Sequence, residues 1–126
     1  MRLIAIFFLI LIYSVIINAQ SSNDSEDGYL AFAEVMPEPV NGMAELIKQV
    51  KYPEIAKKAG LEGKVFAMAY IDEKGSVTDV KIIKGIGGGC DEEVVSVLKK
   101  AKFKPGQNKG TNVKVKMSIP FVFKLK

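Results

Sequence analysis

The sequence predicts an α+β fold, namely a three-stranded antiparallel sheet with helices packed on one of its faces. The final stretch, Val113–Leu125, carries apolar residues at every odd position and mostly polar residues between them, which is the period of a half-buried strand. A second stretch, Lys64–Asp72, is apolar on both faces and therefore suits a central strand. Between the two lies an apolar stripe at helical spacing. Strands that share one sheet with a covering helix define the α+β class.

The order of the strands follows from the connections between them. Asp72–Gly75 is a tight turn with glycine at its end, so Ser76–Lys84 returns antiparallel to Lys64–Asp72. A helix over 90–102 then crosses back, and the last strand lies beside the first and antiparallel to it. The predicted sheet order is therefore 2-1-3, with the last strand at an edge. Pro120 agrees with that position, because an edge strand needs no donor on its outer side.

Three helices are expected to cover the sheet. The first is short and amphipathic, with apolar residues at i, i+3, i+4 and i+7: Met43, Leu46, Ile47 and Val50. The second has Pro53 in its first turn and three apolar residues on one face: Ile55, Ala56 and Ala59. The third is capped by Cys90 or Asp91, ends near Lys102 and buries a stripe of Val94, Leu98 and Ala101.

The chain divides into a leader, a linker and one domain. A positive start, the apolar run Leu3–Ile17 and the small residue Ala19 predict a signal peptide over 1–19, with an uncleaved anchor as the alternative. The run is shorter than the ~20 residues that a membrane span needs. Polar residues then predict a flexible linker over 20–41, in which Tyr29–Val35 could be a strand or an arm lying on the domain. The domain occupies 42–126.

Composition excludes most catalytic chemistry. The chain has no histidine, which removes the usual general base and the usual zinc ligand. Cys90 is the only cysteine, so no intrachain disulfide can form. All 14 acidic residues precede Val94, and nine lysines follow it, which favours an acidic partner for the C-terminal part. Nucleic acid is not expected as that partner, because the leader directs the protein to export.

No cluster of side chains predicts an active site. Gly85–Gly89 lacks the lysine and hydroxyl of a phosphate-binding loop, and three acids follow it, so a tight turn is expected. Cys90 has no histidine to activate it and is expected to be a small buried residue or a helix cap. Asp72, Glu73 and Asp79 fit a solvated turn. The sequence therefore predicts no enzyme, no cofactor and no metal site.

The final strand is the candidate functional element. Its outer side is an unpaired edge, which is a template for a further strand from another chain. Lysines and Pro120 could instead protect the edge from pairing, and pattern alone leaves both interpretations open. The candidate partner-binding residues are Val113, Lys114, Val115, Lys116, Met117, Ser118, Ile119, Phe121, Val122 and Phe123.

Six motifs in order resemble the TonB C-terminal domain, in the form typical of Bacteroidetes. They are Tyr52-Pro53 before a short helix, Glu62–Val65, Asp72–Val80, Gly87–Asp91, Phe103–Gly106 and Ile119–Leu125. Met36-Pro37 and Gly42-Met43 resemble the lead-in of such domains, so the resemblance covers about Met36 to Lys126. The family-motif residues are Tyr52, Pro53, Gly63, Gly75, Phe103, Pro105, Gly106 and Pro120, with Phe103 standing where many members carry tryptophan.

The resemblance implies a periplasmic domain that contacts TonB-dependent outer-membrane transporters. In that family the C-terminal strand pairs with the transporter's short Ton box and adds a strand to the sheet. This implication favours partner binding over a merely protected edge. In that family, energy for transport comes from an inner-membrane, proton-driven complex. The resemblance makes this complex a second possible partner.

Two alternatives to a stand-alone binding module follow from the same residues. The long proline-rich spacer of a full energy transducer is missing and the leader looks cleavable, so a secreted module is expected. A retained leader would instead give a short, membrane-anchored energy transducer. Pairing between edge strands of two copies would give a self-associating homodimer.

Overall fold

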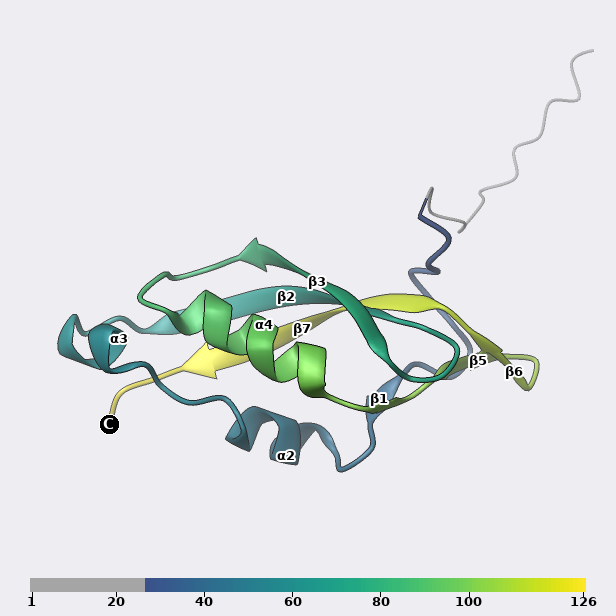
Figure 1. Ribbon diagram of the computed structural model, residues 1–126, viewed down its shortest axis with the longest axis horizontal. Coiled ribbons are helices and arrows are strands. Elements are labelled where there is room, and N and C mark those ends of the chain that lie inside the picture. Colours follow the sequence, from purple (N-terminus) through teal and green to yellow (C-terminus); the bar gives the residue numbers. More distant parts are fainter. Residues whose placement is uncertain (1–26) are drawn as a thin grey trace, which may run out of the picture.

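The computed structural model describes residues 27–126, so the signal peptide expected over 1–19 and the start of the linker lie outside the described residues. Figure 1 shows the helices and strands of the described chain. In order they are β1 (Glu38–Pro39), α2 (Met43–Lys48), α3 (Glu54–Lys58), β2 (Gly63–Ile71), β3 (Val77–Lys84), α4 (Cys90–Lys100), β4 (Phe103–Lys104), β5 (Gly106–Asn108), β6 (Thr111–Val113) and β7 (Val115–Phe123).

The main sheet has the predicted order. Its strands lie in the order β3-β2-β7, and both neighbours of β2 run antiparallel to it. The β2–β7 ladder is unbroken from Gly63 opposite Phe123 to Ile71 opposite Val115. The predicted arrangement, a central strand with one edge strand on each side, is therefore confirmed.

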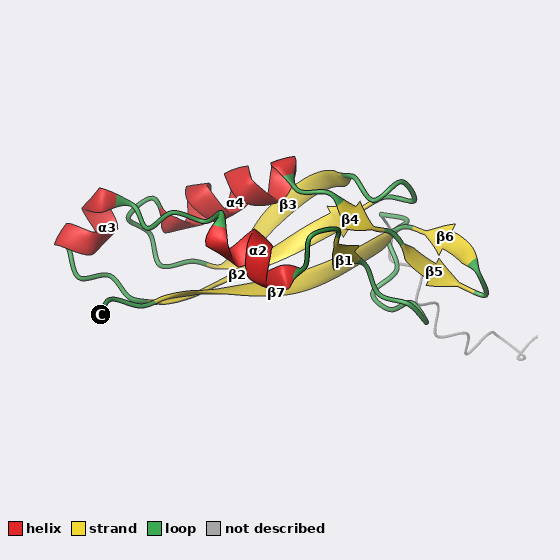
Figure 2. Cartoon of the chain, turned by 90° about the horizontal axis from the view of Figure 1, so that it is seen from below, coloured by secondary structure: helices red, strands yellow, loops and turns green. Residues whose placement is uncertain are grey.

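Among the described helices, α3 and α4 lie on one side of the three strands, as Figure 2 shows. The short helix α2 lies on the β7 side of the sheet in Figure 1, and its Leu46 belongs to the same core. The strand residues that point to the side of α3 and α4 include Val65, Ala67, Ala69, Ile71, Ile119 and Phe121, and they form the core with Val94 and Leu98 of α4. The other side of the sheet, called the open face below, carries Lys64, Phe66, Met68 and Tyr70 on β2, because side chains alternate along a strand.

The helices match the predicted ranges with two corrections. The N-cap of α4 is Gly89 in the left-handed conformation, so neither Cys90 nor Asp91 caps the helix. Ile55, Ala56 and Ala59 are expected on one buried face, but only Ala56 is buried, and both Ala59 and Ile55 (74%) are exposed. A five-residue helix with one turn against the core buries only one of these side chains. Within residues 27–126, no helix combines the length and apolar character that a bilayer span requires.

The predicted last strand is divided in two. Val113 belongs to β6 and pairs with Gly106 of β5, so it is not part of the edge strand, which begins at Val115. The segment before the edge strand forms this β5–β6 hairpin. Its turn has positive φ angles at Lys109 (51°) and Gly110 (75°), as a two-residue hairpin requires.

The described part of the expected linker is bonded to the domain. Leu30 bridges Val115 in parallel, Val35 bridges Gln107, and β1 pairs with β4. Of the two interpretations given for Tyr29–Val35, the structure has the arm lying on the domain. Residues 27–30, which carry its contacts with β7, are called the arm below.

Candidate functional site

The outer edge of β7 can be defined residue by residue from one hydrogen bond. The Lys116 N–H donates to the Leu30 carbonyl, at 2.9 Å, on the side of β7 away from β2. Backbone groups of an antiparallel pair alternate between the two sides of the strand. Ser118, Pro120 and Val122 therefore also direct their backbone groups outwards, and the odd-numbered residues direct theirs to β2.

Pro120 fits this alternation. It is exposed and lies opposite Phe66, at a position whose backbone points away from β2. The missing N–H therefore removes nothing from the β2–β7 ladder, which explains why β7 continues through a proline. The edge between Ser118 and Val122 offers two donors, the N–H groups of those two residues, and the three carbonyls of Ser118, Pro120 and Val122.

One end of the edge already has a backbone partner, Leu30. Leu30 N–H donates to the Lys114 carbonyl at 2.9 Å, and with the Lys116 N–H bond this forms one parallel bridge. Within residues 27–126, Leu30 is the only residue whose backbone bonds to the outer side of β7. The segment Ser118–Val122, about 16 Å long at ~3.3 Å per residue, is therefore open to a further strand.

The two sides of this open segment differ in chemistry. On the helix side, a hollow lies between α2 and the end of β7 and is lined by Ile47, Val50, Tyr52 and Phe121–Lys124. On the open face, Val122 is 60% exposed and lies opposite Lys64, while Ser118 lies opposite Met68. An added strand would therefore meet apolar side chains towards α2 and lysine among apolar groups on the open face.

The ten predicted partner-binding residues fall into three groups. Val113 lies in β6, away from the edge. Lys114, Val115 and Lys116 lie at the end that Leu30 occupies. The remaining six alternate, so that only Ser118 and Val122 turn backbone groups outwards, whereas Met117, Ile119, Phe121 and Phe123 bond to β2 and point their side chains towards the core.

The family-motif residues gather at the two ends of the sheet. At one end, the Tyr52 hydroxyl donates to the Leu61 carbonyl, and its ring lies edge-on to Phe123 at 5.4 Å. Pro53 is the N-cap of α3, and a Cβ on Gly63 would lie 2.9 Å from Ile86.

At the other end, Gly75 packs against Phe103 and Pro105, and a Cβ on Gly106 would lie 2.6 Å from Val115. Both groups therefore hold the sheet, and of the eight motif residues only Pro120 lies on the outer edge.

Sequence reasoning did not find the contribution of the arm. Leu30 and Tyr29 lie more than 80 and 40 residues from Lys114 and Tyr70, respectively, and a short apolar segment after a polar run gives no signal of where it docks. The one available signal was Tyr70, an aromatic residue on the open face. Its side chain is only 8% exposed although no helix covers that face, because Tyr29 packs against it.

The other candidate residues have structural roles. Cys90 is fully buried in the core, as expected. The Asp91 carboxylate accepts the N–H groups of Ile86 at 3.0 Å and Gly87 at 3.4 Å, and so braces the glycine-rich turn before α4. Within residues 27–126, no three potential metal ligands lie together.

Cys90 is expected to react very slowly with thiol reagents in the folded protein. Burial raises the pKa of its thiol above the usual value, and the carboxylates of Asp91 and Glu92 raise it further, so less thiolate is present at mildly alkaline pH than for a free cysteine. Labelling with a chromogenic disulfide should become fast only in denaturant. Equal rates in the presence and absence of denaturant would contradict the burial of this thiol.

The chain matches known proteins over the domain just described. The family model for the C-terminal region of the Gram-negative bacterial TonB protein matches residues 48–125. Protein TonB of Vibrio cholerae serotype O1 is 32% identical over 78 residues, which are 61% of this chain. This chain spans about a third (32%) of the length of that relative.

Two solved structures are similar to the fold. The TonB C-terminal domain of Helicobacter pylori is 26% identical with a TM-score of 0.52, over 66% of this chain and 88% of that one. The corresponding domain of Pseudomonas aeruginosa, with a TM-score of 0.54 over 71% and 87% of the two chains, is 24% identical and supports the fold alone. The family match covers more than half of the sequence, and the chain therefore belongs to the TonB C-terminal domain family.

Proposed function

We propose that this protein is a periplasmic TonB-like module that binds TonB-dependent outer-membrane transporters by accepting their Ton box as an added strand on β7. The family is tied to TonB-dependent transport. The observation that carries the finer proposal is the open edge Ser118–Val122, next to a position where Leu30 already forms a parallel β-bridge. An edge that accepts one short strand has the main-chain geometry to accept another.

The chemistry of binding would come mainly from the backbone. A strand opposite Ser118–Val122 would bond to the two outward N–H groups and the three outward carbonyls, which gives affinity with little dependence on sequence. Selectivity would come from the hollow beside α2 and from the lysines of the open face, which favour a segment with apolar and acidic side chains.

Titration of the isotope-labelled protein with synthetic Ton-box peptides tests this proposal. The expected result is a saturable shift of the Ser118 and Val122 amide resonances, because these two N–H groups change from water to peptide acceptors. The control is the same peptide with prolines substituted at alternate positions, which removes backbone donors. The proposal is wrong if no amide of β7 responds at millimolar peptide.

Light scattering on the same samples tests the homodimer, which predicts a mass that rises with protein concentration.

A further inference from the structure

The arm resembles a ligand strand in its side chains as well as in its backbone. The ring of Tyr29 stands edge-on over Tyr70 of the open face, with ring centres 5.2 Å apart and planes at 86°. The Tyr29 hydroxyl lies 2.6 Å from the Thr78 hydroxyl. The Nζ atoms of Lys81 and Lys114 lie 5.2 Å and 5.7 Å from the centres of the Tyr70 and Tyr29 rings. The edge-on pair of rings is therefore flanked by two lysine side chains.

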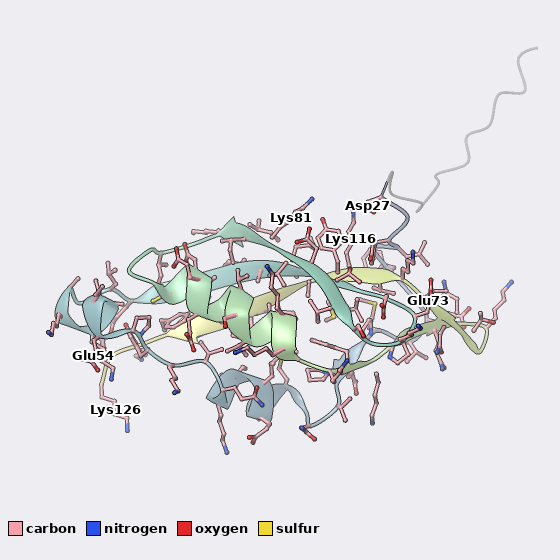
Figure 3. All side chains as sticks on the ribbon, in the orientation of Figure 1. Asp27, Glu54, Glu73, Lys81, Lys116 and Lys126 are labelled. Carbon is pink, nitrogen blue, oxygen red and sulfur yellow. The ribbon has the colours of Figure 1, made fainter. Side chains whose placement is uncertain are left out.

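A carboxylate completes these contacts. The Asp27 carboxylate lies 3.2 Å from the Lys116 Nζ, and Figure 3 shows both residues at the end of the sheet opposite the C terminus. The arm thus presents an acid, then an aromatic ring two residues later, then the apolar residue that bonds to the edge. Asp79, which lies opposite Tyr70, accepts the N–H of its neighbour Val80.

These contacts are weak enough to be exchanged. The side chains of Lys116 and Asp27 keep 22% and 38% of their exposure, so solvent screens the pair. Only two backbone hydrogen bonds tie the arm to β7. The open segment is short and contains Pro120, so a partner strand confined to it makes few bonds. A partner strand that also pairs with Lys114–Lys116 must occupy the position that Leu30 holds.

We propose that the binding site runs along the whole of β7, and that a partner strand displaces the arm and supplies its contacts instead. The ligand class is an extended peptide with an acidic side chain for Lys116 and, two residues on, an aromatic side chain for Tyr70. This inference rests on the proposed function, because it assumes that strands add to this edge. Because the arm is tethered, it competes at an effective concentration of about millimolar, and so sets a threshold for partners.

The test uses the full chain and a synthetic copy of the arm, residues 24–34, as the probe. Y29A removes the ring contact with Tyr70 and the hydroxyl contact with Thr78. F32A is the matched control, since Phe32 is an aromatic residue just beyond the arm with 74% of its side chain exposed. L30P removes the donor to the Lys114 carbonyl and serves as a second loosening variant.

The loosened arm should be visible before any peptide is added. Hydrogen exchange at the Lys116 amide is expected to accelerate in Y29A and L30P but not in F32A, because that amide bonds to the Leu30 carbonyl. The probe is then expected to bind Y29A and L30P roughly tenfold more tightly than the wild type and F32A, since less competition remains. A probe with D27N should bind these variants several-fold more weakly.

Two outcomes separate this proposal from the proposed function. Equal affinity of the probe for all four chains, with shifts confined to Ser118–Val122, would overturn displacement and leave strand addition intact. No response of any β7 amide, to the probe or to Ton-box peptides, would overturn both. Shifts at Lys114–Lys116 together with tighter binding to Y29A and L30P would support displacement.

Discussion

Replacing Ser118 with proline is expected to weaken binding of an added strand by about tenfold or more, with little effect on folding. The Ser118 N–H points away from β2, so it is one of only two donors on the open segment. A lost hydrogen bond in a solvent-excluded contact costs about 1 kcal/mol or more, and the proline ring also obstructs the incoming backbone. Peptide titration and urea unfolding measure the two effects separately.

The neighbouring position gives the opposite result and serves as the comparison. The Met117 N–H points to β2 opposite Ala69, so M117P removes a ladder bond from the sheet. We expect a loss of about 3 kcal/mol or more in unfolding free energy. S118A, which keeps the N–H, should bind as the wild type does. If S118P unfolds as readily as M117P, the alternation deduced for β7 is incorrect.

Much of the main sheet could be predicted because the periods of burial are strong. The apolar residues on both sides of β2 identify a central strand, and the order β3-β2-β7 follows once the turn at Gly75 and the crossing helix are recognised. Pro120 even identifies the outward positions of β7. A proline in an edge strand must point its missing donor outwards, which assigns Ser118 and Val122 to the same side.

The remaining features could not be predicted because they depend on hydrogen bonding without a matching burial pattern. The alternation of side chains continues through Val113 and Lys114, although the strand is interrupted there and Val113 pairs with Gly106. Likewise, the β5–β6 hairpin is polar except for Val113, and its one local signal is the Lys109-Gly110 turn. The period of apolar residues indicates which side chains are buried. It does not indicate which segment supplies the backbone hydrogen-bond partner.

The arm is the clearest case of a contact that the sequence conceals. Leu30 reaches the edge from 84 residues before Lys114, and only two backbone bonds hold it there. No local pattern distinguishes such a segment from the flexible linker that its composition predicts. The candidate site was therefore predicted in the right strand, but not with the outward backbone groups of Lys114 and Lys116 already bonded to Leu30.

Replacing Gly75 with alanine is expected to reduce the unfolding free energy by about 4 kcal/mol. Gly75 has a φ of +82°, and a Cβ there would lie 1.8 Å from the Phe103 carbonyl oxygen. The Gly75 carbonyl also accepts the Phe103 N–H at 2.9 Å, so the two segments cannot separate without breaking this bond. Because Phe103 is only 3% exposed, its displacement would open the core. Urea unfolding measures the loss.

Gly110 separates backbone strain from the steric clash. Its φ of +75° is close to that of Gly75, but nothing lies within 4 Å of a Cβ placed on it. G110A should therefore cost only about 1 kcal/mol, which is the penalty for a side chain at positive φ. Equal costs at the two positions would mean that the approach of Phe103 adds nothing.

The G75A variant also distinguishes an effect on stability from an effect on binding. Gly75 lies in the β2–β3 turn, beyond Ile71 at the end of β2 farthest from Gly63, whereas Ser118 and Val122 pair with Met68 and Lys64. At a temperature where G75A is still folded, its affinity for a Ton-box peptide should equal that of the wild type. S118P should show the reverse pattern, with stability retained and affinity lost. The two variants together therefore assign the Gly75 contact to holding the sheet and the outer edge of β7 to binding the partner.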